Sequence, residues 1–438
     1  MADILVLGAT GYCGRLAALY LSHHPQRSSF TLAIAGRSRS KLEELKKELD
    51  PDVTIFEVDV NNFEDVERVV KQVKVVANTV GPYWRYSTPV VQACARNGVH
   101  HVDITGERPW IYKIIHNFDY LARQTGAIIV PSCGLDSVPS DAIVFLANKT
   151  LKALVGPDAE IEDSVTAVKM KGGVAGGSLA TVIALMEEVP KNVREMSSRA
   201  YSLSPIVGVP TTGYKLLYKL PSFPSSKTVY GSIFPISPGN RAIVLRTWGL
   251  QQFHAFHSNL PESERVGDKM LTYGKTFKYD EFLEVNGKAG AFLRSLSVAV
   301  MGICLMMFSP VRWLFKRLVT QPGQGPSAVR LKQGYMEYLN ITTSVAPPGS
   351  EPTRIRTIIR GNGDPGTLLT ATMLGESALS LLQDGDRLPA LAKLGGVLTP
   401  MTALGDVLIE RLRATGVFEF ESEVVLEGEG EGDERKTR

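Results

Sequence analysis

Three glycines near the start of the chain have the spacing of a loop that binds a diphosphate. The apolar run from Ile4 to Leu7 ends at Gly8, and Gly11 and Gly14 follow in the pattern G-x-x-G-x-x-G. This pattern is typical of a buried strand that turns into a helix, whose first backbone N–H groups face phosphate oxygens. The alternative is an ordinary turn between a strand and a helix. We predict a dinucleotide site that includes Gly8, Thr10, Gly11, Tyr12, Cys13 and Gly14.

The residues after the second predicted strand, 30–35, indicate which dinucleotide is bound. In an NAD-selective site this strand ends in an acidic residue that binds the ribose 2′-hydroxyl. Here the basic sequence G-R-S-R-S-K begins at Gly36 instead. The guanidinium of Arg37, with Ser38 beside it, suits a 2′-phosphate. The pattern therefore predicts NADP(H) as the cofactor, and the alternative is that Arg37 and Arg39 are solvated loop charges.

Polar residues also follow the third and fourth predicted strands. Asp59 ends the third strand, where it suits either the adenine end of a cofactor or a plain turn. Thr79, Gly81 and Tyr83 follow the fourth strand. In a doubly wound sheet this strand ends beside the switch point, where cofactor and substrate meet. We therefore add Asp59, Thr79 and Gly81 to the predicted cofactor site and take Tyr83 as a catalytic candidate.

Four carboxylates follow the fifth and sixth predicted strands, and they are Asp103, Glu107, Asp136 and Asp141. Such groups could position a substrate or transfer a proton. Asp136 and Asp141 also precede apolar helical sequence, so helix N-capping is the alternative for both. We take Asp136 and Asp141, with Tyr83, as the candidates for catalysis. No residue spacing is typical of metal ligands, so we expect no metal site.

The tyrosines bear on the class of reaction. Short-chain carbonyl reductases use a tyrosine with a lysine four residues later, and none of the 14 tyrosines has a lysine at that offset. This observation disfavours that class. Reduction of a carbon–carbon double bond does not need the pair, because hydride goes to carbon and other donors can polarise the acyl carbonyl. The sequence also shows no evident arginine-rich pocket for a substrate with several carboxylates.

Six predicted strands alternate with helices in the first third of the chain, which favours an α/β fold with a doubly wound Rossmann domain. A second α/β domain with a mixed sheet is predicted next, and helices then return to the first domain. Within the second domain we expect Trp248, Tyr335 and Tyr338 to line a substrate groove, and the alternative is that they are core residues. Nearer the end we expect Arg411 and Arg413 to be solvated and not catalytic. The expected domains are 1–147, 148–360 and 361–426, with a disordered tail over 427–438.

In the second half we expect a surface loop over 202–226, strands over 164–171, 241–248, 332–343 and 353–360, helices over 367–383 and 399–414, and an edge strand over 417–426.

Composition and charge limit the kinds of binding partner and the cellular compartment that we expect. The formal net charge of the 438 residues is only +3, which gives no reason to expect nucleic acid. The four cysteines are scattered, as in proteins of reducing compartments. The residues before Gly8 have no basic region and no apolar run of signal length, so we expect a protein that is not secreted. Residues 295–311 carry no charge and basic residues flank them. We interpret 295–317 as a surface that contacts a membrane or a lipid droplet; the alternatives are a buried helix and a homodimer contact.

Seven motifs stand in order along nearly the whole chain. They are G-A-T-G-Y-C-G, A-G-R-S, N-T-V-G-P-Y, D-I-T-G-E, G-L-D-S-V-P-S-D, G-N-G-D-P-G with T-A-T-M-L-G-E-S-A-L, and G-G-V-L-T-P. This series resembles the saccharopine dehydrogenase-like oxidoreductases, which include the trans-acting enoyl reductases of bacterial lipid synthesis. The resemblance implies an NADP-type Rossmann domain and a second α/β domain inserted before the returning helices. Eukaryotic members are associated with lipid droplets and other membranes.

Three hypotheses for function stay open. The first is an NADP(H)-dependent oxidoreductase that reduces a lipid-linked or acyl (enoyl) substrate in lipid or glycolipid metabolism. The second is a non-catalytic NADP-binding protein of lipid droplets or membranes. The third is a saccharopine-type imine reductase of lysine metabolism. We expect an intracellular protein at the cytosolic face of a membrane or lipid droplet, with mitochondrial association and a homodimer as further expectations.

Overall fold

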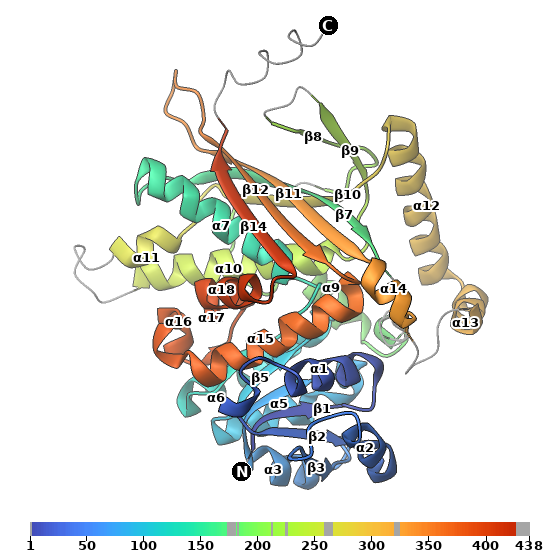
Figure 1. Cartoon of the computed structure of the whole chain (residues 1–438). Helices are drawn as coiled ribbons and strands as arrows, with labels where there is room; N and C mark the ends of the chain where they lie inside the picture. Colours follow the sequence, from blue (N-terminus) through green and yellow to red (C-terminus); the bar gives the residue numbers. More distant parts are fainter. Residues whose placement is uncertain are drawn as a thin grey trace, which may run out of the picture.

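The computed structural model describes residues 2–172, 181, 184–211, 213–223, 227–257, 266–318 and 325–425. Two seven-stranded sheets organise these residues (Figure 1). The first sheet is parallel throughout, in the order β13-β6-β5-β4-β1-β2-β3. Its strands are β1 (Ala2–Leu7), β2 (Leu32–Gly36), β3 (Thr54–Glu57), β4 (Val73–Asn78), β5 (His100–Asp103), β6 (Ile128–Val130) and β13 (Gly396–Val397).

Helices cover both faces of the first sheet, because the apolar side chains of its strands point both ways. Ile4 and Val6 of β1 pack in one hydrophobic cluster, whereas Leu5 and Leu7 pack in another on the opposite face. The helices of this part are α1 (Tyr12–Ser22), α2 (Arg39–Lys46), α3 (Phe63–Val70), α4 (Tyr83–Tyr86), α5 (Thr88–Asn97), α6 (Arg108–Thr125) and α7 (Val138–Val155). The predicted doubly wound Rossmann architecture is confirmed.

The second sheet is mixed, in the order β14-β12-β11-β7-β10-β9-β8, with β7 and β10 parallel and the other pairs antiparallel. Its strands are β7 (Ile161–Lys171), β8 (Tyr218–Pro221), β9 (Thr228–Ser232), β10 (Lys278–Glu284), β11 (Tyr335–Ser344), β12 (Arg354–Asn362) and β14 (Phe418–Val424). Nearby helices are α9 (Lys191–Ser198), α10 (Ser237–His257), α11 (Val266–Leu271), α12 (Lys288–Met307), α13 (Ser309–Leu318) and α14 (Ala328–Gln333). The buried helix α7 contains the predicted boundary at 147 and lies against this sheet (Figure 1).

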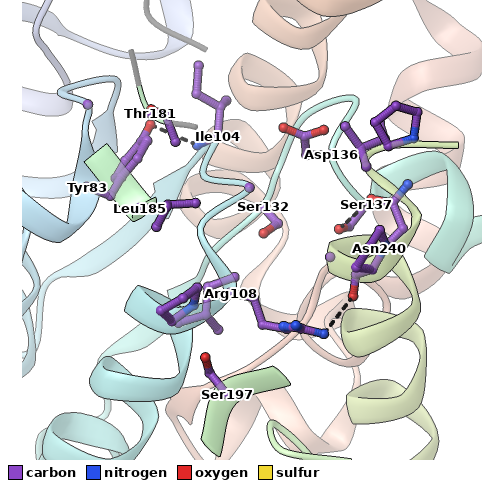
Figure 2. Close-up of a pocket in the computed structure, with 18 of the residues that line it drawn as sticks. Tyr83, Ile104, Arg108, Ser132, Asp136, Ser137, Thr181, Leu185, Ser197 and Asn240 are labelled. Carbon is purple, nitrogen blue, oxygen red and sulfur yellow. Dashed lines mark hydrogen bonds between the residues drawn. The ribbon is translucent and has the colours of Figure 1, made fainter. Parts of the chain in front are cut away.

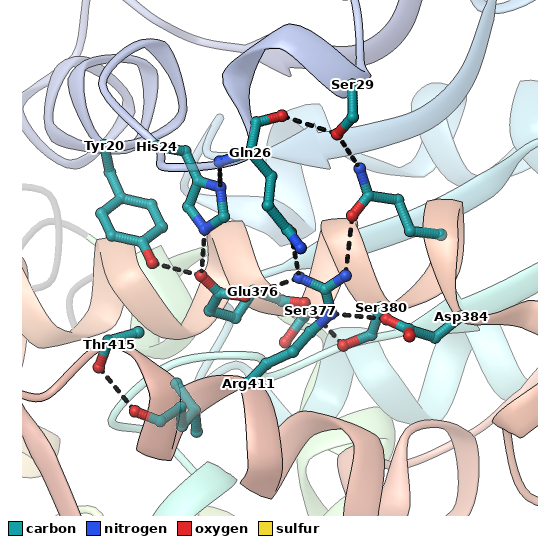
Figure 3. A network of polar contacts seen from close by, with 12 residues as sticks. Tyr20, His24, Gln26, Ser29, Glu376, Ser377, Ser380, Asp384, Arg411 and Thr415 are labelled. Atoms are coloured by element: carbon teal, nitrogen blue, oxygen red, sulfur yellow. Dashed lines mark hydrogen bonds and ion pairs between the residues drawn. The ribbon is translucent and has the colours of Figure 1, made fainter.

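The C-terminal part returns to the first sheet, as predicted. It contains α15 (Thr370–Gln383), α16 (Ala390–Lys393), α17 (Pro400–Ala403) and α18 (Gly405–Ala414), and it adds β13 beside β6. A polar network joins α15 and α18 to α1 (Figure 3). The buried Glu376 carboxylate accepts hydrogen bonds from Tyr20 and His24 and forms an ion pair of 3.2 Å with Arg411. Arg411 also pairs with Asp384 at 2.6 Å, so the prediction that Arg411 is solvated is wrong.

Several predicted elements of the second half differ from the structure. Residues 241–248 lie inside the buried helix α10, not in a strand, because a short apolar run with little polar punctuation fits both a buried strand and a buried helix. Trp248 and Tyr338 are core residues, and neither lines the cavity described below. The predicted loop over 202–226 contains β8. Lys332, the first residue of the strand predicted over 332–343, lies in α14 instead. The predicted tail over 427–438 lies outside the described residues.

The apolar segment 295–311 belongs to two helices that lie at the edge of the molecule (Figure 1). α12 ends at Met307, and α13 begins at Ser309, next to Pro310. α12 is the one described helix long and apolar enough to cross a membrane, with a mean hydropathy of 1.8, and only 17% of that window is buried. The segment is therefore not a buried core helix.

Candidate active site

The glycine-rich turn after β1 has the geometry that the sequence predicts. Gly8 has a φ of 83°, in the region that favours glycine, and its carbonyl oxygen accepts the Gly11 N–H at 2.9 Å. A Cβ atom on Gly14 would overlap the Gly8 carbonyl oxygen and the Thr79 hydroxyl. Both the N–H and the hydroxyl of Thr79 bind the Leu7 carbonyl, at 2.9 and 2.8 Å. The turn thus brings backbone close to the first turn of α1, as a bound diphosphate requires.

The basic residues after β2 lie at the edge of the same turn. A Cβ atom on Gly36 would lie 3.5 Å from the Thr10 hydroxyl, so Thr10 and the residues after Gly36 are neighbours. Arg37 is exposed and forms no ion pair or hydrogen bond with any other described residue. Arg39 pairs with Glu43 at 3.0 Å, and the hydroxyl of Ser38 bonds that of Ser40. The free guanidinium of Arg37 fits a 2′-phosphate, which stays a prediction for this residue.

Asp59 follows β3, but its carboxylate is engaged in a local turn. Its Oδ1 atom accepts the Asn61 backbone N–H at 3.0 Å and the Asn61 side-chain amide at 2.9 Å. Asp59 is exposed and lies outside the cavity described next. The structure therefore supplies a turn role for Asp59, and its adenine role stays a prediction.

A cavity of about 540 Å³ extends from the first turn of α1 to the second domain (Figure 2). Six of the predicted site residues line it, and they are Tyr12, Cys13, Thr79, Gly81, Tyr83 and Asp136. The beginnings of four helices meet there: Tyr12 and Cys13 of α1, Arg108 and Pro109 of α6, Ser137 before α7, and Pro238, Gly239 and Asn240 of α10. The N-terminal ends of helices carry partial positive charge, so the cavity favours negative charge in a ligand.

Two acids beside the cavity are used to build its wall. The buried Glu107 carboxylate accepts the backbone N–H groups of Tyr83 and Trp84, at 2.6 and 2.7 Å. Asp103 accepts the N–H groups of Thr105 and Ser132, at 2.9 and 3.1 Å. Burial raises the pKa of Asp103 to about 7 and also raises the pKa of Glu107. These carboxylates fix the turns after β4, β5 and β6.

The three catalytic candidates lie in different surroundings. The Tyr83 hydroxyl donates to the Asn78 carbonyl at 3.1 Å and accepts the Ile104 N–H at 3.3 Å, so backbone groups hold it. Asp141 lies away from the cavity, where its carboxylate accepts the Met401 N–H at 2.9 Å. It therefore joins α7 to α17.

Asp136 is the one predicted catalytic carboxylate that lines the cavity (Figure 2). Its side chain forms no hydrogen bond with the residues that the structure describes, and the first turn of α7 has no side-chain cap. A Cβ atom on Gly106 would lie 2.8 Å from its Oδ2 atom, so glycine gives this carboxylate its space. Burial raises the pKa of Asp136 to about 6, a value suited to proton transfer near neutral pH.

Sequence reasoning missed three polar residues at the second-domain side of the cavity. Arg108 and Asn240 line the cavity, and the buried Glu281 lies behind Asn240. The Asn240 amide donates to Glu281 at 2.8 Å, and its carbonyl accepts the Ser137 hydroxyl at 3.2 Å. Glu281 lies on β10, far along the chain, and no local motif marks it. Two arginines, Arg108 and Arg194, line the cavity, although the sequence shows no evident arginine-rich pocket.

Comparisons with known proteins agree with this geometry. Residues 4–130 match the family model described as the saccharopine dehydrogenase NADP binding domain. A protein from Mycobacterium tuberculosis whose name describes it as a trans-acting enoyl reductase is 32% identical to this chain over 439 residues. The match covers 95% of this chain and 96% of the relative. The chain belongs to the saccharopine dehydrogenase-like oxidoreductase family. A protein from Mycobacterium bovis named trans-acting enoyl reductase is 30% identical, over 95% of this chain and 96% of its own.

A solved structure shows the same fold for this family member. Apo saccharopine dehydrogenase (L-Glu forming) from Saccharomyces cerevisiae matches with a TM-score of 0.50 and 13% identity, over 97% of this chain and 100% of that chain. The matched NADP-binding domain contains the glycine turn and Arg37. This family member is therefore an NADP(H)-dependent oxidoreductase with a small-molecule substrate.

Proposed function

We propose that this family member reduces the carbon–carbon double bond of a lipid-linked or other acyl substrate, with NADPH as the reductant. The observation that carries the proposal is the cavity that runs from the glycine turn of the cofactor domain to Asp136 and the second domain. Ile104, Ile111 and Leu185 give its wall an apolar part, which suits an acyl chain. The relatives named trans-acting enoyl reductase support the same reaction.

Different residues of the site would serve different steps of such a reduction. The glycine turn and Arg37 would hold the cofactor, which supplies a hydride when bound. Saturation of the double bond also needs one proton at the carbon next to the acyl carbonyl, and the Asp136 carboxyl group, which lines the cavity, would donate it. Negative charge develops on the acyl oxygen during the reaction. The N-terminal end of α7, which begins just after Asp136, would stabilise that charge.

The test is a panel of substrates with the purified full chain and NADPH. We expect oxidation of NADPH with enoyl thioesters, and much slower oxidation with carbonyl compounds. An imine formed from an amino acid and a keto acid tests saccharopine-type chemistry, which the cavity arginines Arg108 and Arg194 favour as the second candidate. Tight NADPH binding with no oxidation by any of the three classes would instead support a non-catalytic NADP-binding protein.

We further propose that α12 and α13 place the protein on an intracellular membrane or lipid-droplet surface. Their exposed apolar side chains are Phe292, Leu293, Leu296, Val300, Met301, Ile303, Met306, Met307, Trp313 and Leu314. An exposed apolar surface of this extent is unusual for a soluble monomer. Arg294 and Arg317 supply positive charge beside it, and the Arg317 guanidinium lies 3.9 Å from the Trp313 ring centre. Apolar helices with basic neighbours suit an anionic lipid surface.

Flotation with liposomes tests this surface. The protein should float with vesicles that contain anionic lipid, and the double substitution Met301→Glu with Met306→Glu should abolish flotation. Tyr120→Glu is the matched control, because Tyr120 is an exposed apolar residue on α6, 76% exposed, outside the surface. A wild-type protein that stays unbound but elutes as a dimer, with a monomeric double variant, would identify the surface as a homodimer contact.

A further inference from the structure

Arg108 is a charged residue of the cavity that lacks a counterion among the residues that the structure describes. It is the first residue of α6, and it is mostly buried. Its one hydrogen bond runs from Nη1 to the Pro238 carbonyl at 3.4 Å. No described carboxylate lies within ion-pair distance of its guanidinium. The nearby acid Glu107 is bound to the backbone of Tyr83 and Trp84 instead.

The surroundings of Arg108 make its burial more costly. Desolvation lowers the pKa of Arg108, and the neighbouring Arg241 lowers it further. Arg194 adds another cation to the lining of the cavity. The N-terminal ends of α6 and α10 add partial positive charge on the same side. A buried cation without a partner destabilises a fold, so residues of this kind are retained where a ligand supplies the missing charge.

Asp136 does not supply that charge. Arg108 and Asp136 line the same cavity, but no ion pair joins them. In Figure 2 the Asp136 carboxylate lies on one side of Ser132 and the Arg108 guanidinium on the other. A ligand in the cavity would therefore meet a proton donor and a cation at separate places.

We propose that Arg108 binds a negatively charged oxyanion of the substrate, a carboxylate or a phosphate, and that Asp136 faces the reacting carbons. The substrate is then an acyl compound with an anionic group, and not a neutral lipid. The anion has two sources with the same chemistry. It belongs either to the acyl chain, as a carboxylate, or to the carrier arm of a thioester, as a phosphate. The inference rests on the proposed function only for the acyl part of the ligand.

Binding of unreactive saturated probes tests the inference without turnover. Isothermal titration of the NADP⁺-loaded full chain would compare three probes: the neutral butyryl thioester of N-acetylcysteamine, its succinyl analogue with a carboxylate, and butyryl phosphopantetheine with a phosphate. We expect one anionic probe to bind at least about tenfold more tightly than the neutral probe, as a charge-assisted bond would give. The probe that gains affinity identifies the source of the anion.

The variant Arg108→Gln should bind the neutral probe as before and lose the preference for the anionic probe. Arg108→Lys keeps the charge but not the planar fork, and should keep part of the preference. The control Arg387→Gln removes an exposed arginine that pairs with Glu410 and should change nothing. The affinity for NADP⁺ should be the same in all variants. Equal binding of charged and neutral probes by the wild type would overturn the inference, as would a parallel loss of NADP⁺ affinity in Arg108→Gln.

Thermal stability gives a second readout, which does not depend on any ligand of the proposed reaction. If Arg108 serves a ligand, its replacement by Gln should leave the melting temperature of the free protein unchanged or raise it. A melting temperature of Arg108→Gln below that of Arg387→Gln would show that Arg108 stabilises the fold, and would overturn the inference. A protein that prefers the anionic probe but never oxidises NADPH would refute the proposed reaction and leave the anion site in place.

Discussion

Asn240 donates its side-chain N–H to the Glu281 carboxylate at 2.8 Å, and this bond connects the cavity wall to a buried acid of the second sheet. Glu281 also accepts the hydroxyl groups of Ser140 and Tyr279, at 2.7 and 2.9 Å. All three donors converge on one carboxylate without a cation among them. Burial consequently raises the pKa of Glu281 to about 7. The free energy of unfolding should therefore depend on the protonation of Glu281.

The Glu281 carboxyl group should stabilise the fold less as pH rises. Its pKa is about 7 in the folded protein against 4.5 for a free side chain, so the folded state retains a proton that the unfolded state releases. The contribution is therefore present below pH 4.5 and is lost as pH rises through 7, by about 1.4 kcal/mol per pH unit at most. The difference in unfolding free energy between the wild type and Glu281→Gln should shrink over this range, measured by urea unfolding.

Asp65→Asn is the control for the pH effect. A hydrogen bond from Arg68 lowers the pKa of the half-buried Asp65, so the contribution of Asp65 to stability is lost only at acidic pH. The stability difference for Asp65→Asn should be constant between pH 4.5 and 7. A Glu281→Gln difference that grows with pH would contradict the assignment of a raised pKa.

Asp136 should set the pH dependence of the reduction. Its pKa is about 6 because of burial, and only the protonated carboxyl group can donate a proton. The value of kcat should therefore fall as pH rises above 6. Asp136→Asn should lower kcat by about 10² to 10⁴-fold with unchanged NADPH affinity, since general acid catalysis contributes that much. Steady-state rates across pH would check this, and an Asp136→Asn enzyme with the wild-type rate and profile would exclude Asp136 as the donor.

Arg37 should select NADPH over NADH. Its exposed guanidinium has no partner among the described residues, so it is available to a 2′-phosphate. Arg37→Ala should weaken NADPH by at least about tenfold and leave NADH nearly unchanged, by fluorescence titration. The neighbouring Arg39, which pairs with Glu43, provides the matched control Arg39→Ala. Equal affinities of the wild type for the two cofactors would contradict this role.

Arg411 should hold the C-terminal helices to the first domain. Its guanidinium pairs with the buried Glu376 and with Asp384, at 3.2 and 2.6 Å. Arg411→Met leaves Glu376 buried without its cation and should lower the unfolding free energy by about 3 kcal/mol. Arg387→Met, which breaks the pairs of Arg387 with Glu410 and Asp384, should lower the unfolding free energy much less, because Arg387 is exposed to solvent. Similar losses in the two variants, measured by denaturant unfolding, would argue against a special role for Arg411.

The glycine turn of the cofactor domain could be predicted from the sequence, because the turn is local. Gly8, Gly11 and Gly14 lie within one turn, and the steric need for glycine there is visible from spacing alone. The alternation of strands and helices likewise predicts the parallel sheet. The place of Arg37 after the second strand is equally local, and its role at a 2′-phosphate stays a prediction.

The substrate half is assembled from distant residues, so sequence reasoning could not place it. Asp136 and Asp141 look alike in sequence, but one lines the cavity and the other binds the Met401 N–H of α17. Asn240 lines the cavity from the first turn of α10. The apolar run 241–248 that follows it predicts a strand, but it lies in the same helix. These positions follow from tertiary packing, which no local pattern encodes.

Transfer of deuterium from NADPH to the substrate tests the central claim most directly. The full chain would be incubated with NADPH deuterated at C4 of the nicotinamide, in each configuration in turn, and with an enoyl thioester. Mass spectrometry and NMR of the product would locate the label. We predict one deuterium at the β-carbon of the saturated acyl group, from one of the two labelled cofactors. Tight NADPH binding with no label in the product from either cofactor would contradict the claim that this protein is an enoyl reductase.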